Sequence, residues 1–529
     1  MAVRLIHIIF LFTFCLNGQA QQLQVLSEKE AWEKEVRAII NDSLNEKSLS
    51  WRLQEAGFWL YQIDSNQLNT GPKLLIGELV YEDEERLSPG LSLNDSNFKA
   101  VLSQELKLIE NQGYPFASFQ LRDYSIEKNR LQAQLILNRG PLIRFDSLVL
   151  LSYDGTNRKF IEREADWRKG RPYSSEYLEQ VNRNLKRLEF IQFERNPALA
   201  FFPAKARVYL YLKKRSANLI NGVVGLNTDG EGSSPLTGDF QLRLLNTFKR
   251  GEEINLQWRS PGNQAQDFNL SFAYPYLWNS PLGLKIQLEI FRQDSSFLRR
   301  DIKLSLPYRL APGSHFKVSG QYFSTNPLGL NPQSELQIDE VTSYRFNLGF
   351  DLDRRNNPIV STEGYLLDLE LGSGRRTSNM AESTQYLWQG QFQYFLAFQK
   401  RWVWHQDFSS LGMTGSDLQD NEIFRLGGLK NLRGFNEWSF FTPAYALMRS
   451  EVRFMLGQYD YLSAFADLAF NEVDRKNQSP WDRHSGLGLG LNFQTKGGIF
   501  SLFLAVGQSN NSSYDFRSGK IHLAYLNRF

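Results

Sequence analysis

Cysteine is almost absent from this chain of 529 residues, and the single one, Cys15, lies near the N-terminus. The stretch around it has a short basic start, a largely apolar run from Leu5 to Leu16, and the small residues Gly18 and Ala20 at the spacing that a signal peptidase recognises. We therefore expect residues 1–20 to be an export signal and the mature chain to contain no cysteine. Disulfide bonds and cysteine-ligated metals are then excluded from the mature protein.

Long apolar runs and an excess of one charge are missing as well. Mean hydropathy is −0.41 although 14% of the residues are aromatic. After the predicted signal no segment approaches about 18 consecutive apolar residues, which excludes helical membrane spans. The 60 lysines and arginines nearly balance the 57 acidic residues, and neither sign is gathered into one block. This distribution does not favour a nucleic-acid site or a polybasic membrane patch.

Histidine is scarce, and the common catalytic motifs are absent. The five histidines are scattered singly, and the sequence contains no H-E-x-x-H, G-x-S-x-G or P-loop pattern. Gly486, Gly488 and Gly490 alternate with leucines, but no helix follows them, as a phosphate-binding loop would require. These glycines instead favour a strand with a small-residue inner face. We expect no enzyme activity, no cofactor and no metal.

The chain divides near residue 216, and the part before this point contains a repeated pattern. A helical apolar face from Phe98 to Ile109 precedes two alternating strands over residues 113–137. About 70 to 75 residues later the pattern returns as a strand, a short helix, a longer helix and two closing strands, near 193–202 and 206–212. Small α+β modules in series produce such a repeat. The expected boundaries are 21–73 for a partial module, 74–140 and 141–215 for two complete modules, and 216–529 for the remaining domain.

After Ser216 the helical period disappears, and strands of about ten residues alternate apolar and polar side chains. One example runs from Leu284 to Ile290, where leucines and isoleucines alternate with Lys285, Gln287 and Glu289. Each strand thus has an apolar side and a polar side. In a soluble β-sandwich the apolar side would face a second sheet, whereas in a membrane barrel it would face lipid.

Three further features favour the membrane barrel. Sixteen strands are counted between Asn218 and Phe529, and a closed antiparallel barrel of this kind has an even number. Short connections alternate with long ones, of which Leu411 to Pro443 is the longest. The chain ends on an apolar face with Tyr525 and the terminal Phe529, which resembles the assembly signal of outer-membrane barrels. We therefore expect α+β periplasmic modules followed by an all-β, 16-stranded antiparallel transmembrane barrel.

The longest connection contains the segment Leu432-Arg433-Gly434-Phe435. It resembles the [V/L]-R-G-[F/Y] signature in the sixth outer loop of the BamA/TamA superfamily, and the modules before the barrel resemble that family's POTRA domains. The resemblance implies that this loop folds back into the barrel and that Arg433 meets acidic groups on the inner wall. An arginine in a solvated surface loop is the alternative interpretation.

Suitable carboxylates follow the loop in the sequence. Glu451 lies on the polar side of its strand, between Arg449 and Arg453, and Phe465-Ala466-Asp467 is similar to the family's F-x-D element. By alternation both carboxylates face the lumen. A guanidinium group bound to them would offset the entropy that the loop loses on docking. Gly434 would allow a tight turn beside the wall, and Phe435 would pack among lumen aromatics.

The resemblance also implies a protein that acts on other polypeptides. One hypothesis is an assembly factor that receives client strands on its modules and inserts them through a weak seam between the first strand, 218–228, and the last, 519–529. A two-partner-type secretion pore is an alternative that the sequence does not separate from it, and a passive porin is a third. The expected location is the bacterial outer membrane, with the N-terminal modules in the periplasm. The expected partners are outer-membrane lipid, unfolded outer-membrane protein clients or a secreted passenger, and accessory periplasmic lipoproteins, with no nucleic acid.

Overall fold

The computed structural model describes residues 24–26, 36, 38, 61–64, 67–69, 75–82, 98–127, 130–151, 155–226, 236–260, 265–293, 296–329, 337–379, 381–473, 481–495, 498–510 and 513–528. The predicted export signal and the terminal Phe529 lie outside these residues. Contacts between Cα atoms divide the chain into two compact units. The first comprises Met1–Asp146, Gly170–Tyr177 and Phe201–Ala206, and the second comprises Ser147–Lys169, Leu178–Ala200 and Arg207–Phe529.

Two small sheets and a helix are described in the N-terminal part of the chain. The first sheet has the order β1 (Gln24–Leu26), β3 (Gln67–Asn69) and β2 (Gln62–Asp64). In the second sheet β6 (Arg130–Asn138) is central, with β4 (Leu75–Glu82) parallel to it and β5 (Ser118–Glu127) antiparallel. Helix α3 (Phe98–Asn111) precedes β5, so the predicted order of helix, strand and strand is confirmed.

Alternating buried side chains form the inner face of this second sheet, and a glycine allows the tight turn after its helix. In β6 the side chains of Leu135 and Leu137 are buried, and Ile109 is buried near the end of α3. Just after the helix, Gly113 has a φ of +113°, and a Cβ atom there would lie 2.5 Å from Leu142 Cδ1. Only glycine fits both this backbone angle and this close approach.

The next stretch follows the predicted order of strand, two helices and closing strands. It contains β7 (Arg144–Leu151), α4 (Arg158–Glu164), α5 (Ser175–Lys186), β8 (Ile191–Phe193), β9 (Ala198–Phe202) and β10 (Lys205–Lys214). The sheet order is β7-β10-β8, and β9 also pairs with β10. The single strand expected near 193–202 is in fact two short ones, β8 and β9, because Pro197 between them has no backbone N–H for a ladder. No helix among the described residues is long and apolar enough to cross a membrane.

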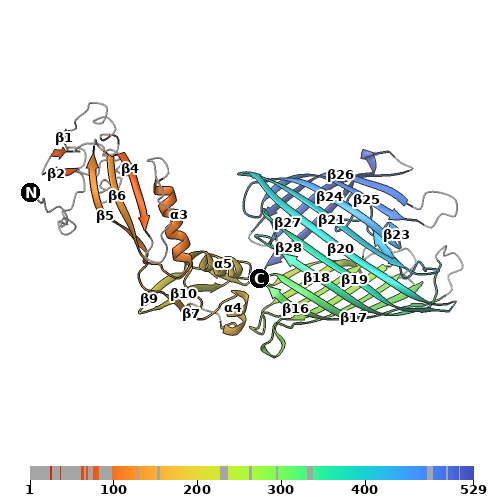
Figure 1. Ribbon diagram of the computed structural model, residues 1–529. Helices are drawn as coiled ribbons and strands as arrows, with labels where there is room; N and C mark the ends of the chain where they lie inside the picture. The colour runs from red at the N-terminus through yellow and green to blue at the C-terminus, as the bar shows by residue number, and fades with distance from the viewer. Residues whose placement is uncertain are drawn as a thin grey trace, which may run out of the picture. The chain divides into compact units, whose positions relative to one another are not determined.

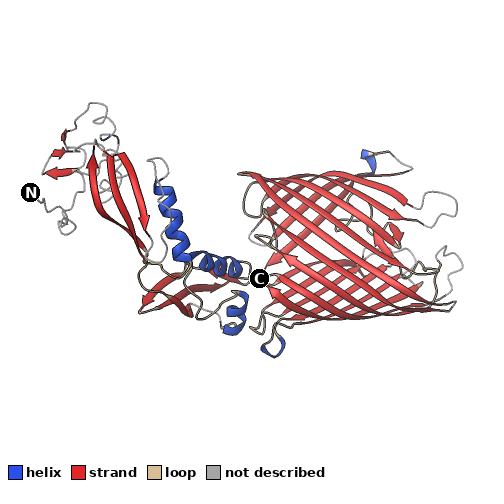
Figure 2. Ribbon diagram, viewed as in Figure 1, coloured by secondary structure: helices blue, strands red, loops and turns tan. Residues whose placement is uncertain are grey.

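The remaining chain forms a closed barrel of sixteen antiparallel strands, which confirms the predicted fold class and strand number (Figures 1 and 2). The strands are tilted and follow one another around the wall in chain order. They are β11 (Leu219–Leu226), β12 (Leu236–Leu245), β13 (Glu253–Ser260), β14 (Ala265–Tyr274), β15 (Leu284–Gln293), β16 (Phe297–Ala311), β17 (Ser314–Pro327), β18 (Val341–Asp353), β19 (Gly364–Ser378), β20 (Glu382–Gln399), β21 (Trp402–Thr414), β24 (Ala444–Met455), β25 (Tyr461–Glu472), β26 (Trp481–Gln494), β27 (Ile499–Ser509) and β28 (Lys520–Arg528).

Four short elements are described in the connections of the barrel. A hairpin of β22 (Phe424–Leu426) and β23 (Phe440–Thr442) belongs to the long connection between β21 and β24. Two 3₁₀ helices, η2 (Leu277–Asn279) and η3 (Phe516–Ser518), lie between β14 and β15 and before β28.

Side chains of the barrel alternate as the sequence predicts. In β18 the aromatic and aliphatic residues Tyr344, Phe346 and Leu348 are 64%, 57% and 45% exposed, whereas Arg345 and Asn347 between them are buried. An outer surface covered by exposed apolar side chains and an inner surface lined by polar ones is the arrangement of a barrel that spans a lipid bilayer.

The barrel closes at a weak joint. Its first strand, β11, pairs with its last strand, β28, through Leu219–Arg528 and Ile220–Asn527, and these are the two pairs found among the described residues. By comparison, β11 makes eight pairs with β12, and β27 makes seven with β28. Fewer ladder hydrogen bonds therefore hold this joint, which we call the seam, than hold either neighbouring pair of strands.

Candidate functional site

The connection between β21 and β24, which we call the lumen loop (residues 415–443), packs against the inside of the barrel wall. In β25 the odd-numbered side chains are buried and the even-numbered ones from Leu462 to Ala466 are exposed. Leu426 and Leu432 of the lumen loop are fully buried and pack with Leu447 of β24 and Ala469 of β25. The loop therefore lies on the inward-facing residues of these strands.

The lumen loop begins later than the sequence predicted. Residues from Leu411 onward were expected in the loop, but β21 continues to Thr414. Leu411 pairs with Tyr445 and Gly412 with Ala444 of β24, because the alternating pattern and the ladder both extend beyond the predicted strand end.

Arg433 binds two carboxylates on the inner wall. Its Nε donates to Asp467 Oδ2 (2.8 Å) and its Nη2 to Asp467 Oδ1 (2.6 Å), so the pair is bidentate. The Arg433 backbone N–H also donates to Asp467 Oδ2 (3.1 Å), and Nη1 donates to Glu451 Oε2 (2.9 Å). The second oxygen of Glu451 accepts from Arg453 Nε (2.8 Å). The side chains of Arg433, Asp467 and Glu451 are all more than nine-tenths buried, so a buried network with paired charges holds the loop.

Phe465, the aromatic residue of the F-x-D element, stacks against the guanidinium group of Arg433. The Cζ atom of Arg433 lies 3.5 Å from the centroid of the Phe465 ring, and the Phe503 ring lies farther off at 5.7 Å. A planar cation stacked on an aromatic face is favoured electrostatically, especially away from water. Phe465 thus fixes the plane in which Arg433 meets Asp467.

Glycines in the loop itself and on two strands of the wall, β26 and β27, make room for the loop. Gly434 has a φ of +94°, and a Cβ atom there would lie 2.7 Å from the carbonyl carbon of Val506 in β27. On the wall, a Cβ atom at Gly486 of β26 would lie 2.0 Å from the Arg433 carbonyl oxygen, and one at Gly507 of β27 would lie 2.7 Å from the Gly434 carbonyl oxygen. The small-residue inner face predicted for β26 is therefore the surface on which the loop rests.

Phe435 packs beside this surface. Its ring lies edge to face with Phe440 of the same loop (5.2 Å between centroids) and with His484 of β26 (5.7 Å). His484 in turn stacks on Phe440 at 4.0 Å. The segment Leu432 to Phe435 thus contributes an apolar anchor, a cation, a tight turn and an aromatic ring in four consecutive positions.

The sequence did not reveal two other anchors of the same loop. Arg449, two residues before Glu451, donates to Asp407 of β21 (2.8 Å) and to the Lys430 carbonyl oxygen (2.7 Å). Nearer the start of the loop, Arg376 of β19 forms an ion pair with Glu422 (2.7 Å). Asp407 and Arg376 occupy polar positions of ordinary alternating strands, and only the register of distant strands shows which charges they meet.

The residues proposed as an assembly signal are only partly described. Tyr525 lies on β28, and its ring centroid is 4.4 Å from that of Phe500 on β27. Phe529 lies outside the described residues. Their role as an assembly signal stays a prediction.

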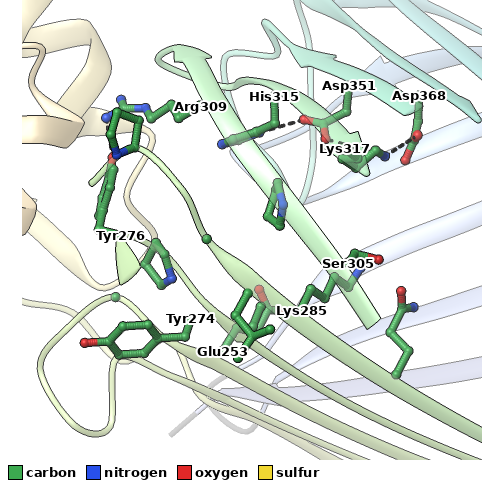
Figure 3. A pocket seen from close by; sticks show the side chains of 18 of the residues that line it. Glu253, Tyr274, Tyr276, Lys285, Ser305, Arg309, His315, Lys317, Asp351 and Asp368 are labelled. Carbon is green, nitrogen blue, oxygen red and sulfur yellow. Dashed lines mark hydrogen bonds and ion pairs between the residues drawn. The ribbon is translucent and has the colours of Figure 1, made fainter. Parts of the chain in front are cut away.

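A cavity of about 390 Å³ lies at the short-turn end of the barrel (Figure 3). Acidic and basic side chains line it in nearly equal number, and some of them are paired: Lys317 Nζ lies 2.6 Å from Asp368 Oδ1, and His315 Nδ1 lies 2.8 Å from Asp351 Oδ2. The cavity offers hydrogen-bond donors and acceptors without a strong excess of either charge.

Tyr276 and Arg309 border this cavity and lie close together in Figure 3. The Tyr276 hydroxyl donates to Glu164 Oε1 of α4 (2.5 Å), and Arg309 donates to the carbonyl oxygen of Arg163 (2.5 Å). Burial, followed by the nearby Glu164 charge, raises the pKa of the Tyr276 phenol, so this hydroxyl stays protonated and remains a donor. These bonds tie α4 to the short turns of the barrel within the second unit.

Within the part of the chain that the structure describes, no group of three or more His, Cys, Asp or Glu side chains is placed to hold a metal ion. Several carboxylates of the lumen bind basic side chains: Asp467 and Glu451 bind Arg433, Asp407 binds Arg449, and Asp368 binds Lys317.

A sixteen-stranded barrel with an apolar outer surface, a long loop fixed inside its lumen and small α+β modules before it defines an outer-membrane β-barrel protein of the BamA/TamA type. The family model described as the Omp85 superfamily domain matches residues 246–522, and the chain belongs to this superfamily. No curated protein sequence matches the chain.

Solved structures with a similar fold include those of BamA and CdiB. The structure of BamA from Haemophilus ducreyi lacking POTRA domains 1–3 is 15% identical, with 86% of this chain and 100% of that chain covered and a TM-score of 0.50. CdiB from Escherichia coli is 12% identical, with 94% and 98% covered and a TM-score of 0.51. At these identities the likeness concerns the fold alone.

Proposed function

We propose that this protein assembles other β-barrel proteins into the outer membrane, by offering them an edge of its own barrel. The observation that carries this proposal is the seam, where β11 and β28 share two residue pairs in the described part of the chain. Separating two strands held by so few hydrogen bonds exposes unpaired N–H and C=O groups, and such an edge pairs readily with an incoming strand.

The docked lumen loop favours a lateral route for the client polypeptide, through the seam in the barrel wall, over a route along the barrel axis. A polypeptide that moved along the barrel axis would have to displace a loop held by the buried contacts of Arg433 with Asp467 and Glu451. Breaking a buried ion pair is costly because each charge is left without its partner. A client strand that pairs with β11 or β28 does not require this step.

The modules before the barrel supply further strand edges. In the sheet of β4, β6 and β5 the outer strands, β4 and β5, each have one side that pairs with no other strand among the described residues. An extended client segment can add to such an edge through main-chain hydrogen bonds, with little demand on its sequence. The proposed partners are therefore unfolded outer-membrane proteins, with accessory periplasmic lipoproteins as further candidates, and we propose no catalytic turnover of a small molecule.

A secretion pore for a dedicated passenger is the second candidate. The cavity at the short-turn end favours it, because its mixed polar lining suits a chain that enters the lumen from that side. In this function the lumen loop would have to leave its site during each passage.

A covalent lock on the seam separates the two functions. Ile220 and Asn527 are Cα partners across the seam, and the predicted mature chain has no other cysteine, so Ile220→Cys with Asn527→Cys can form a unique disulfide. Each single variant is the control, and a reductant should restore activity. Under oxidising conditions the lock should lower the amount of folded barrel proteins in the outer membrane, measured by quantitative proteomics after depletion of the wild type.

The outcomes of this experiment differ between the candidates. A locked barrel that still supports the outer-membrane proteome but loses one secreted protein would indicate secretion. If depletion of the protein changes neither the outer-membrane proteome nor any secreted protein, both functions are wrong.

A further inference from the structure

The lumen loop contacts two parts of the wall that lie on opposite sides of the seam. Residues 430–435 contact the strands near the end of the chain, through Arg433 on β24 and β25 and through Gly434 on β27. Glu437 and Trp438 contact the strands near the start of the barrel, through Arg259 on β13 and Phe291 on β15. β12, β11 and β28 lie between these two contact regions. The loop therefore spans the seam from inside the lumen.

An ion pair forms the contact with β13. Arg259 Nη2 lies 3.1 Å from Glu437 Oε2, while Arg259 Nε binds Asp239 Oδ2 of β12 at 3.0 Å. The other oxygen of Glu437 accepts from the backbone N–H of Leu429 (2.9 Å), which joins the two limbs of the loop. At Gly428, where φ is +100°, a Cβ atom would lie 2.2 Å from Glu437 Cδ. The glycine lets the carboxylate lie directly against the loop backbone and face Arg259.

Aromatic contacts accompany this ion pair. Trp438 packs edge to face with Phe291 (5.5 Å between centroids), and the two belong to a cluster with Ala265 and Phe297. Arg425 of the loop places its Cζ atom 3.6 Å from the Phe291 ring centroid. Among the described residues its Nε and Nη2 atoms have no hydrogen-bond partner. On this side the loop thus relies on stacking and a single ion pair.

The two attachments differ in how readily they break. The Arg433 side chain is 7% exposed and its partners Asp467 and Glu451 are 0% and 5% exposed, with two bonds to Asp467 alone. Arg259 and Glu437 are 16% and 24% exposed and share one bond. When the ion pair between Glu437 and Arg259 breaks, Arg259 remains bound to Asp239. Water can then reach the carboxylate of Glu437 and the guanidinium group of Arg259, so little charge is left unpaired. The attachment to β13 is therefore the one that releases first.

We propose that Glu437 and Arg259 form a release latch for the seam. The loop stays bound to β24, β25 and β27 while the ion pair of Glu437 with Arg259 of β13 breaks. The seam opens only after this ion pair has broken. Glu437 is thus a positioning residue that sets how often the seam opens. The latch rests on the lateral opening of the proposed function, but it describes a motion of the barrel alone and is measurable without a client.

Hydrogen–deuterium exchange of the full-length protein in lipid nanodiscs tests the latch. Amide exchange in β11 and β28 reports the open population of the seam. Glu437→Gln preserves the size of the side chain and removes its charge, and it should raise exchange in these two strands by up to about fivefold, the range of a partly exposed ion pair. Exchange in β19 and β20, on the far side of the barrel, should not change.

A double-mutant cycle distinguishes the latch from a general loosening of the loop. Arg259→Gln should raise seam exchange like Glu437→Gln, and the double variant should add little to either single one. The matched control is Glu382→Gln, which removes a carboxylate from an ion pair with Arg375 that does not involve the loop and is more than half exposed. It should leave seam exchange at the wild-type rate.

Three results would overturn the latch: no change of seam exchange in Glu437→Gln, an equal rise in all strands, or full additivity with Arg259→Gln. None of these results bears on client insertion, which the depletion experiment measures separately. Conversely, a latch that behaves as expected in a protein that supports no client would leave the motion established and the proposed function wrong.

Discussion

Arg376 and Glu422 form an ion pair in which both side chains are essentially inaccessible to water, with exposures of 0% and 1%. Arg376 also donates to the carbonyl oxygens of Ser416 (3.2 Å) and Asp417 (3.1 Å), while Glu422 accepts from the backbone N–H of Gln419 (2.8 Å). One guanidinium group thus organises the start of the lumen loop, before the chain turns inward to Arg433.

Replacing Glu422 should therefore release the start of the loop. Glu422→Gln leaves Arg376 buried without a counter-charge, and breaking such a pair costs about 3 to 5 kcal/mol. We expect residues 415–423 to become sensitive to protease added outside intact cells, with the barrel itself still folded. Arg375→Gln is the control, because the neighbouring Arg375 binds Glu382 at an exposed position. Equal protease resistance of Glu422→Gln and wild type would contradict the prediction.

Replacing Arg433 should weaken the docking of the loop. Arg433→Ala leaves Asp467 and Glu451 with unbalanced charge in a confined lumen, at a cost of about 3 to 5 kcal/mol. The temperature at which the folded barrel converts to the unfolded form on a denaturing gel should fall. In a double-mutant cycle with Asp467→Asn the two effects should be strongly non-additive. Independent, additive effects would mean that the pair does not hold the loop.

Adding a single methyl group at Gly434 should also weaken the docking of the loop. In Gly434→Ala the new Cβ atom would meet β27 at 2.7 Å, and its φ of +94° is unfavourable for alanine. Positions of this kind cost about 1 to 3 kcal/mol when a side chain is added. The same gel assay measures the effect, and Gly320→Ala on β17, where no atom lies within 4 Å of the new Cβ, is the control. If both variants convert at the wild-type temperature, the close approach of the loop to β27 is not required.

Tyr173 should make the N-terminal part of the chain sensitive to alkaline pH. Burial, and then the nearby Glu110 carboxylate, raises the pKa of the Tyr173 phenol from 10.0 to about 12. Between these two pH values the unfolded chain has lost the phenolic proton and the folded chain has kept it, so stability falls as the pH rises. The contribution of Tyr173 is fully present below pH 10.

The urea midpoint of the helical circular dichroism signal measures this effect, since the described α-helices all precede the barrel. The midpoint should fall between pH 9 and pH 11 in the wild type and fall less in Tyr173→Phe. Tyr344→Phe, at a position on the outer barrel surface with 64% exposure, should behave as the wild type does. The same pH dependence in all three proteins would show that Tyr173 is not responsible.

The barrel could be predicted from the sequence because its signal is local. Tyr344, Phe346 and Leu348 alternate with Arg345 and Asn347 within one strand, and a period of two residues is sufficient to assign an outer and an inner face. The strand count and the inward position of Glu451 and Asp467 follow from the same rule. The strand ends do not follow from this rule, as β21 shows, because a ladder can extend beyond the clearest alternation.

The partners of the charged residues could not be predicted in the same way. Asp407 binds Arg449 and Glu437 binds Arg259, and each pair depends on the register between strands or on the path of a long loop. Neither is encoded by a short pattern. Arg433 with Asp467 is the exception, because the four-residue segment and the F-x-D element both resemble a known family and could be paired on that ground.

The position of the lumen loop has a mechanical consequence. A ring with one weak joint normally fails at that joint when its sides are pulled apart, and the described residues provide two ladder pairs to resist this at the seam. Here a cross-brace runs inside the ring from β13 to β25, so tension in the plane of the membrane is shared between the joint and the brace. Because one ion pair and aromatic stacking hold the brace on this side, it can detach here while its other end stays bound to β24 and β25. The ring then resembles a clip that is closed by the brace as well as by the seam, so the ion pair of Glu437 with Arg259 contributes to the force that keeps it shut.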